Sequence, residues 1–330
     1  MKPKPKLKTN PFDQKFVILS ISGGGYKGIY SVNALKSIDD FFESDKNIID
    51  RVDMVCGTSV GAITSAFLSL DKPISDAAEY LESNIPPIFK KSLTQKMPII
   101  GKCFGHKDRT IIFKDSIKML FEDKKMEDCK IPVIIPVLNF DTGSPKLFKS
   151  YLSADKKRFL WDVLMAATST PLLFDIHVCC EGTMWLDGAF YANSPTMIGI
   201  IEALRNKIQL ENIYVLSVGT THDKFTYKES AFKYLPLRQH FRINDKLSSV
   251  FINSQISHVN DMVSILLNET KPDRYYHIDY NCGACQSESF DDEKQVSNEG
   301  IRVLKQLAKD RAGLFTKTDL FNILNKRGEI

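Results

Sequence analysis

The feature that most constrains the fold is a unit that occurs twice near the N-terminus: a short apolar run, a turn with glycine, and an amphipathic helical pattern. The first unit has an apolar run at residues 16–21 and apolar positions spaced by three or four across residues 26–42. The second has an apolar run at residues 52–56 and the same helical spacing over residues 60–70. Such short runs, rich in β-branched residues and ended by glycine, are typical of strands buried on both faces. Strands that alternate with helices predict a mostly parallel sheet covered by helices on both sides.

Later segments continue this pattern. Further strands are expected at residues 133–138, 147–151, 213–218 and 275–280, and further helices at residues 159–168, 247–267, 298–312 and from Ser194 and Pro195 onward. The sequence thus predicts an α/β fold with a mostly parallel central sheet. One domain is expected over residues 15–330, with a motif core at 15–221 and a more helical part at 222–330; two tightly packed domains are the alternative. Lysine alternates with proline at the start, so residues 1–14 are expected to be a basic flexible tail.

Composition excludes several classes of protein. The 44 Lys and Arg residues against 40 Asp and Glu give a net charge of +4, too small a bias over 330 residues to indicate nucleic-acid binding. No apolar run approaches the ~18 residues of a membrane span, and no secretory signal follows the first residues, so we expect a cytoplasmic protein. The seven cysteines are odd in number and scattered, and the Cys282-Gly283-Ala284-Cys285 segment lacks a second ligand pair. We expect neither a disulfide framework nor a bound metal.

A candidate nucleophile lies in the second turn. Gly57-Thr58-Ser59-Val60-Gly61 fits the G-x-S-x-G nucleophile elbow, directly after an expected strand and directly before an expected helix. A serine on such a tight turn projects from the sheet, and the following helix N-terminus favours negative charge at the reacting centre. The same five residues also fit a serine-capped turn. Their strand–turn–helix context favours Ser59 as a nucleophile.

The first turn offers backbone donors. Gly23-Gly24-Gly25-Tyr26-Lys27-Gly28 presents successive N–H groups almost without side chains, which an oxyanion hole requires. The same residues spell G-x-G-x-x-G, so a nucleotide-binding protein that holds phosphate on this loop is the alternative. A dinucleotide fold would need an acidic residue about 20 positions on, at the end of the next strand. Asp39 and Asp40 instead fall at the end of the expected helix, which disfavours this alternative.

A candidate base is the carboxylate of Asp187. None of the six histidines lies in a sequence setting that recommends it as the partner of Ser59. Asp187 follows apolar residues that would exclude water and raise its basicity, and precedes the small residues Gly188 and Ala189. An isolated Asp-Gly pair would instead indicate a turn.

Taken together, these motifs resemble the patatin-like phospholipase family. That family joins a G-G-G-x-R/K-G oxyanion loop, a G-x-S-x-G serine and a D-G-G/A aspartate, in the order found here. Two flanking blocks are also similar, Ala166-Ala167-Thr168-Ser169-Thr170-Pro171 and Asn193-Ser194-Pro195, the latter followed by Leu216-Ser217-Val218-Gly219-Thr220. The resemblance covers about residues 15–221. It departs from the pattern at Ser22, where Asp often stands, and at Lys27, where Arg is common.

The resemblance implies a three-layer patatin-like fold and hydrolysis of phospholipid acyl esters without a metal or other cofactor. By this resemblance Ser59 attacks the ester carbonyl, Asp187 takes the hydroxyl proton and later activates water, and N–H groups of the Gly23 to Gly28 loop, chiefly those of Gly24 and Gly25, bind the oxyanion. A catalytically silent patatin-like module is the alternative within the family.

Two further expectations concern membranes and control. Proline-broken apolar runs near lysines at residues 85–91 and 97–100 fit either a loop that enters a bilayer interface or burial in the core. The basic segment at residues 224–246 fits either a solvated face or a site for an anionic regulator. The order of segments also resembles bacterial patatin-like effectors switched on by cyclic nucleotides in antiphage defence. We therefore expect the protein to bind membrane phospholipids peripherally and to respond to a cyclic-nucleotide activator. A homo-oligomer is also expected, whereas a nucleic-acid polymer is not an expected partner.

Overall fold

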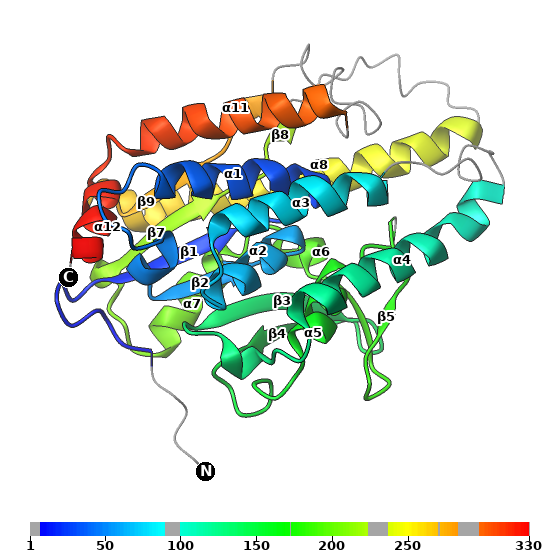
Figure 1. The fold of residues 1–330 in the computed structure, drawn as a ribbon, viewed down its shortest axis with the longest axis horizontal. Coiled ribbons are helices and arrows are strands. Elements are labelled where there is room, and N and C mark those ends of the chain that lie inside the picture. The colour runs from blue at the N-terminus through cyan, green and yellow to red at the C-terminus, as the bar shows by residue number, and fades with distance from the viewer. Residues whose placement is uncertain are drawn as a thin grey trace.

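The computed structural model describes residues 7–89, 100–171, 173–223, 237–269, 271–282 and 297–329 of the chain (Figure 1). Its centre is an eight-stranded sheet in the order β5-β6-β3-β2-β1-β7-β9, with β4 paired to β3. The strands are β1 (Phe16–Ile21), β2 (Met54–Gly57), β3 (Val133–Asn139), β4 (Ser144–Lys149), β5 (His177–Val178), β6 (Met184–Asp187), β7 (Ile213–Val218) and β9 (Tyr275–Ile278). A separate two-stranded sheet joins β8 (His222–Asp223) to β10 (Asn281–Cys282).

The middle of the sheet is parallel, as the sequence predicts. Strand β1 pairs in parallel with both β2 and β7. Next to these, β2 pairs in parallel with β3, and β7 pairs in parallel with β9. The remaining pairs, β3 with β4, β3 with β6 and β5 with β6, are antiparallel. Consecutive strands β1 and β2 lie side by side while the chain returns to the other side of β1 only at β7. The carboxyl ends of β1, β2 and β7 therefore meet at a point where strand order reverses, which is where open α/β sheets bind their ligands.

Helices cover both faces of this sheet (Figure 1). They are α1 (Gly28–Asp39), α2 (Val60–Ser69), α3 (Ile74–Phe89), α4 (Ile100–Phe121), α5 (Leu160–Thr168), α6 (Ala189–Ala192), α7 (Thr196–Arg205), α8 (Leu237–Asn268), α11 (Asn298–Phe315) and α12 (Asp319–Glu329). Short 3-10 turns occur at Gly25–Lys27, Ile48–Arg51, Met126–Asp128 and Leu210–Asn212.

The alternation of side chains along β1 divides the core in two. Val17, Leu19 and Ile21 belong to one apolar cluster, which also holds residues of α1 to α5, α11 and α12. Phe16 and Ile18 belong to a second cluster, with residues of α7 and α8. Every residue of β1 is buried. A strand covered on both faces must be apolar throughout, which explains the continuous run in the sequence.

Some expected elements differ from the observed ones. Residues 85–89 are the end of helix α3, which contains Pro86 and Pro87, and the side chains of Ile85 and Ile88 are buried. Of the two alternatives for this segment, the structure favours burial in the core over an interfacial loop for residues 85–89; residues 90–99 lie outside the described residues. Helix α4 was not expected, because its apolar residues show no clear amphipathic spacing.

The ends of the chain pack against each other at the amino ends of β1 and β2. Arg327 of α12 donates two hydrogen bonds to the carboxylate of Asp13, both 2.9 Å, and one of 2.8 Å to Asp53. Leu7 is buried in the second apolar cluster. The described part of the expected flexible tail is thus held against the sheet and against the C-terminal helix.

The length and apolar character of the helices decide whether one of them can cross a membrane. Within the residues that the structure describes, no helix is long and apolar enough to cross a bilayer.

Candidate active site

Ser59 lies on a strained turn at the carboxyl end of β2. Its backbone has φ 54° and ψ −125°, a conformation that residues other than glycine seldom adopt. The strain places Ser59 at the N-terminus of α2, where the helix dipole favours negative charge. The side chain is not sealed off, since the residue keeps 8% of its surface exposed. A nucleophile elbow has this geometry.

The glycines of this turn allow the backbones to approach closely. A Cβ atom on Gly57 would lie 2.3 Å from the carbonyl oxygen of Gly61. A Cβ atom on Gly61 would lie 2.3 Å from the carbonyl oxygen of Ile21, at the end of β1. Side chains at either position would push α2 away from β1. The other elbow residues are also buried: Thr58 donates a 2.7 Å hydrogen bond to the carbonyl of Ala192, and Val60 packs against Gly28.

The glycine loop follows β1 and runs directly beside the serine. A Cβ atom on Gly23 would lie 3.1 Å from the Cβ atom of Ser59. Gly24 and Gly25 are partly exposed, whereas Gly23 and Gly28 are buried. The two motifs that the sequence places in different turns are thus brought together at one end of the sheet.

The structure distinguishes among the N–H groups of this loop. Gly23 donates its N–H to the carbonyl of Asn193 over 3.0 Å, and Lys27 donates to the carbonyl of Gly24 over 3.1 Å. Gly28 donates to the carbonyls of Gly25 and Tyr26. For Gly24 and Gly25, the described residues supply no acceptor. Of the loop residues expected to form an oxyanion hole, these two have the N–H groups that can turn to a ligand.

Two residues outside the three motifs hold the glycine loop. Asn193 accepts the Gly23 N–H on its carbonyl and donates its side-chain amide to the Gly23 carbonyl over 3.1 Å. Thr220, just after β7, donates its hydroxyl to the same carbonyl over 2.9 Å. Both residues belong to blocks that the sequence marks only by family resemblance. Their roles depend on contacts between distant segments, so no local pattern could assign them.

Asp187 ends β6 and is almost fully buried, with 1% of its surface exposed. One carboxylate oxygen accepts the N–H of Ala189 over 2.8 Å, and the other accepts the hydroxyl of Thr170 over 2.7 Å. The Ser59 hydroxyl lies close enough to this carboxylate to lower its pKa. Gly188 is required here because a Cβ atom at this position would lie 2.3 Å from the carbonyl of Pro136 on β3.

Burial makes Asp187 a better base. Removal of the carboxylate from water raises its pKa to about 6, although the hydrogen bonds from Ser59, Ala189 and Thr170 oppose the rise. Such a pKa leaves the group ionised near neutral pH and still able to accept a proton, which suits a general base. Ser59 and Asp187, 128 residues apart in sequence, are thus brought close enough together for the serine hydroxyl to lower the pKa of the carboxylate.

The two histidines whose hydrogen bonds are described lie away from Ser59 and Asp187. In the described part of the chain His177 pairs with Asp162 over 2.8 Å, and His277 contacts Ser217 and Asp279 over 3.0 and 3.3 Å. Neither pair includes Ser59 or Asp187. The described residues contain no group of three or more His, Cys, Asp or Glu side chains able to hold a metal ion.

The sequence profile of the patatin-like phospholipases matches residues 19–200, more than half of the chain. The chain belongs to this family. The glycine loop, the serine elbow and the Asp-Gly-Ala motif of this patatin-like protein all lie within the matched residues, as does Asn193. Thr220 lies outside them. The three-layer fold expected from the family is confirmed by the observed sheet and its two helical layers.

Several characterised proteins are similar to this patatin-like chain. A cGAMP-activated phospholipase of Vibrio cholerae is 26% identical over 239 residues, which cover 65% of this chain and 66% of the relative. A cGAMP-activated phospholipase of Pseudomonas aeruginosa is 25% identical over 296 residues, covering 87% of this chain and 85% of the relative. A plant relative from Arabidopsis thaliana, "Probable inactive patatin-like protein 9", is 25% identical over 287 residues, covering 77% and 71%.

The match to the Vibrio cholerae relative spans just under two thirds of that protein's length. Among solved structures, VipD from Legionella pneumophila is similar with a TM-score of 0.45 and 12% sequence identity, over 94% of this chain and 72% of that one.

Proposed function

We propose that this protein is a lipid acyl hydrolase of the phospholipase A type, which cleaves membrane phospholipid esters through a Ser59–Asp187 dyad. The observation that carries the proposal is the position of Ser59, on its strained elbow, beside a buried carboxylate whose pKa burial raises to about 6 and the Ser59 hydroxyl lowers in part. Strain at a serine and a perturbed acid in direct contact with it are features of catalytic sites rather than of structural turns.

The chemistry proceeds in two halves. Ser59 Oγ bonds to the ester carbonyl carbon while Asp187 takes the hydroxyl proton, and the N–H groups of Gly24 and Gly25 stabilise the oxyanion that forms. The carbon–oxygen bond to the lipid alcohol then breaks, and the proton on Asp187 passes to the departing alcohol. Water next attacks the acyl-serine and gives its proton to Asp187. As the bond between the acyl carbon and Ser59 Oγ breaks, Asp187 returns that proton to Oγ, so that the fatty acid, the serine hydroxyl and the free carboxylate are released. No step needs a metal or another cofactor.

The substrate lies in a membrane, so we propose a cytoplasmic protein that binds bilayers peripherally. Phe190 supports this proposal, because it is 48% exposed and lies three residues after Asp187. On α4, Ile111 and Ile112 are 49% and 60% exposed. Exposed apolar side chains suit contact with acyl chains.

We also propose that a cyclic nucleotide activates the hydrolase, as part of bacterial antiphage defence. The support comes from the relatives in Vibrio cholerae and Pseudomonas aeruginosa, both named as cGAMP-activated phospholipases. Of the basic segment that the sequence offers as a regulator site, residues 224–236 and the side chains of residues 237–246 lie outside the described residues.

The proposal is tested by the release of free fatty acid from mixed phospholipid vesicles in EDTA, with and without cyclic nucleotides. Wild type, Ser59→Ala and Asp187→Asn are compared. We expect each substitution to lower the rate by at least about 10³-fold, and the double variant to be no slower than either single one, because the two residues act as a unit. Activity retained in Ser59→Ala would refute the mechanism, and absence of activity in wild type under every condition would favour a catalytically silent patatin-like module.

A further inference from the structure

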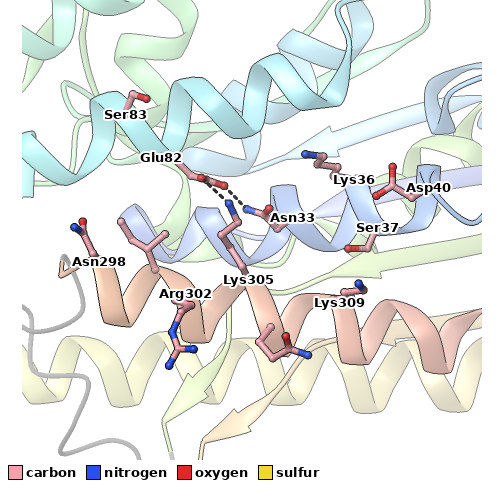
Figure 2. Close-up of a pocket in the computed structure, with 12 residues that line it drawn as sticks. Asn33, Lys36, Ser37, Asp40, Glu82, Ser83, Asn298, Arg302, Lys305 and Lys309 are labelled. Carbon is pink, nitrogen blue, oxygen red and sulfur yellow. Dashed lines mark hydrogen bonds and ion pairs between the residues drawn. The ribbon is translucent and has the colours of Figure 1, made fainter.

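A polar groove lies on the outer surface of helix α1, away from the dyad. Helices α1, α3 and α11 line it, and its volume is about 690 Å³ (Figure 2). Neither the dyad nor any residue of the glycine loop is part of its lining. A volume of this order suits a small ligand.

Helix α1 contributes a stripe of polar side chains to this groove. Asn33, Lys36, Ser37 and Asp40 recur at spacings of three and four and so lie on one face of the helix. Nearly all other residues of α1 are buried in the core, among them Leu35 and Ile38. The groove therefore holds the part of α1 that faces outward between its two neighbours.

The charges in the groove are unequal. Four cationic side chains line it, those of Lys36, Arg302, Lys305 and Lys309, against the carboxylates of Asp40 and Glu82. Glu82 is already engaged, because it accepts a 2.8 Å bond from Lys305 and a 3.0 Å bond from Asn33 (Figure 2). These bonds neutralise its charge from within the groove.

The remaining cations are available to a ligand. Lys36 and Lys309 have no ion-pair partner within the described residues, and Arg302 pairs only with Glu299, in an exposed bridge of little energy. Asn298, in the first turn of the long helix α11, also lines the groove, so the positive end of that helix dipole adds to the field. The groove thus combines a positive potential with hydroxyl and amide groups from three helices.

We propose that this groove is a regulatory site for a small phosphodiester anion. Lys36 and Lys309 bind the phosphates, while Asn298, Ser37 and Gln306 offer hydrogen bonds to polar groups between them. This inference rests on the activation part of the proposed function, and it moves the expected regulator site from residues 224–246 to α1, α3 and α11. A soluble cyclic dinucleotide and the headgroup of an anionic phospholipid share this phosphodiester chemistry.

The position of α1 gives the ligand a route to the active site. The helix begins at Gly28, the last residue of the glycine loop, and a Cβ atom there would lie 2.4 Å from Val60, the neighbour of Ser59. A ligand that ties α1 to α3 and α11 fixes the helix that carries the loop. The N–H groups of Gly24 and Gly25 are then held against Ser59 in the arrangement that binds an oxyanion.

The test measures binding by calorimetry with the Ser59→Ala protein, so that no hydrolysis interferes. The probes are 3′,3′-cyclic GMP–AMP, cyclic UMP–AMP and, for the lipid source, glycerophosphoglycerol. We expect at least one probe to bind, Lys36→Gln/Lys309→Gln to weaken it by about tenfold or more, and Ser37→Glu to abolish it. The control Lys317→Gln/Lys326→Gln removes the same charge from exposed positions in the turn after α11 and on α12, and should bind like the parent.

Each outcome has a definite meaning. Binding of a cyclic dinucleotide identifies a soluble regulator, whereas binding of glycerophosphoglycerol alone identifies a lipid headgroup. Failure of every probe to bind, or binding unchanged in both groove variants, would overturn the proposal. The result is independent of catalysis, because binding lost in the groove variants supports the site even if the wild-type protein releases no fatty acid.

Discussion

The two ends of strands β1 and β2 carry polar clusters of opposite character. At the amino ends Arg327 binds Asp13, Asp53 and the carbonyls of Lys15 and Arg51. At the carboxyl ends Ser59 is strained, Asp187 is buried without a cation, and two N–H groups of the glycine loop have no acceptor within the described chain. In the first cluster the polar groups bind one another. In the second cluster polar groups remain that a ligand can bind.

The difference shows why a perturbed pKa alone does not identify a functional site. Burial raises the pKa of Asp39 to about 7, further than that of Asp187, while the N–H of Ile48 and the charge of Arg51 oppose the rise. Yet Asp39 lies at the end of α1, beside the structural cluster and far from any nucleophile in sequence or contact. Asp187 is distinguished by its position beside a strained serine, so geometry decides where the pKa does not.

Removal of Arg327 should have the largest effect on stability. The variant Arg327→Met leaves the partly buried carboxylates of Asp13 and Asp53 without their guanidinium partner. We expect the free energy of unfolding in urea to fall by about 3 kcal/mol, the low end of the range for a broken buried ion pair. Fatty-acid release per folded molecule should stay unchanged, and adding Asp53→Asn should restore part of the stability. If fatty-acid release per folded molecule also fell, the two ends of the strands would be coupled.

Blocking the glycine loop should instead affect the rate. In Gly24→Ala the new Cβ atom would lie 2.2 Å from the hydroxyl of Thr220, so the loop must move. We expect kcat to fall on the order of 10²–10³-fold, as for loss of an oxyanion donor. Gly313→Ala is the matched control, because a Cβ atom there meets nothing within 4 Å. It should keep its activity and gain up to about 1 kcal/mol of stability.

The ionised carboxylate of Asp187 should lower the stability of the folded protein. Its pKa is about 6 in the folded protein against an ordinary 3.8, so the native state loses stability as pH rises from about 4 through 6. Asp187→Asn should therefore be more stable than wild type by about 1–3 kcal/mol at pH 8 and equal to it below pH about 4. Urea unfolding at both pH values measures this. Asp175→Asn, at an exposed carboxylate, should show no such gain.

The smallest expected effect concerns the partner of this carboxylate. Thr170→Val removes one hydrogen bond to Asp187, and so lets its pKa rise further. The wild-type rate should decline as pH falls below about 6, and in the variant this decline should begin about one pH unit higher. Thr168→Val is the control, since that hydroxyl donates to the carbonyl of Leu164 instead. An unchanged pH profile in Thr170→Val would show that Asp187 is not the base.

The sequence predicted the strands before the two turns because their apolar runs are short, rich in β-branched residues and followed by glycine. It did not predict that the N-terminal segment would pair with α12, since Asp13 and Arg327 are separated by almost the whole chain. It also assigned no role to Asn193 or Thr220. These residues act through single hydrogen bonds to Gly23, and such bonds leave no periodic pattern in a sequence.

By itself, then, the sequence determined the α/β class, the strand–turn–helix setting of Ser59 and the small residues around Asp187, because these follow from local periodicity and backbone sterics. The tertiary structure decided that Ser59 and Asp187 lie together, which N–H groups of the glycine loop are free to turn outward, and that α1 carries a cationic groove between α3 and α11. Those properties depend on distances between segments far apart in the chain, and only the packed sheet fixes such distances.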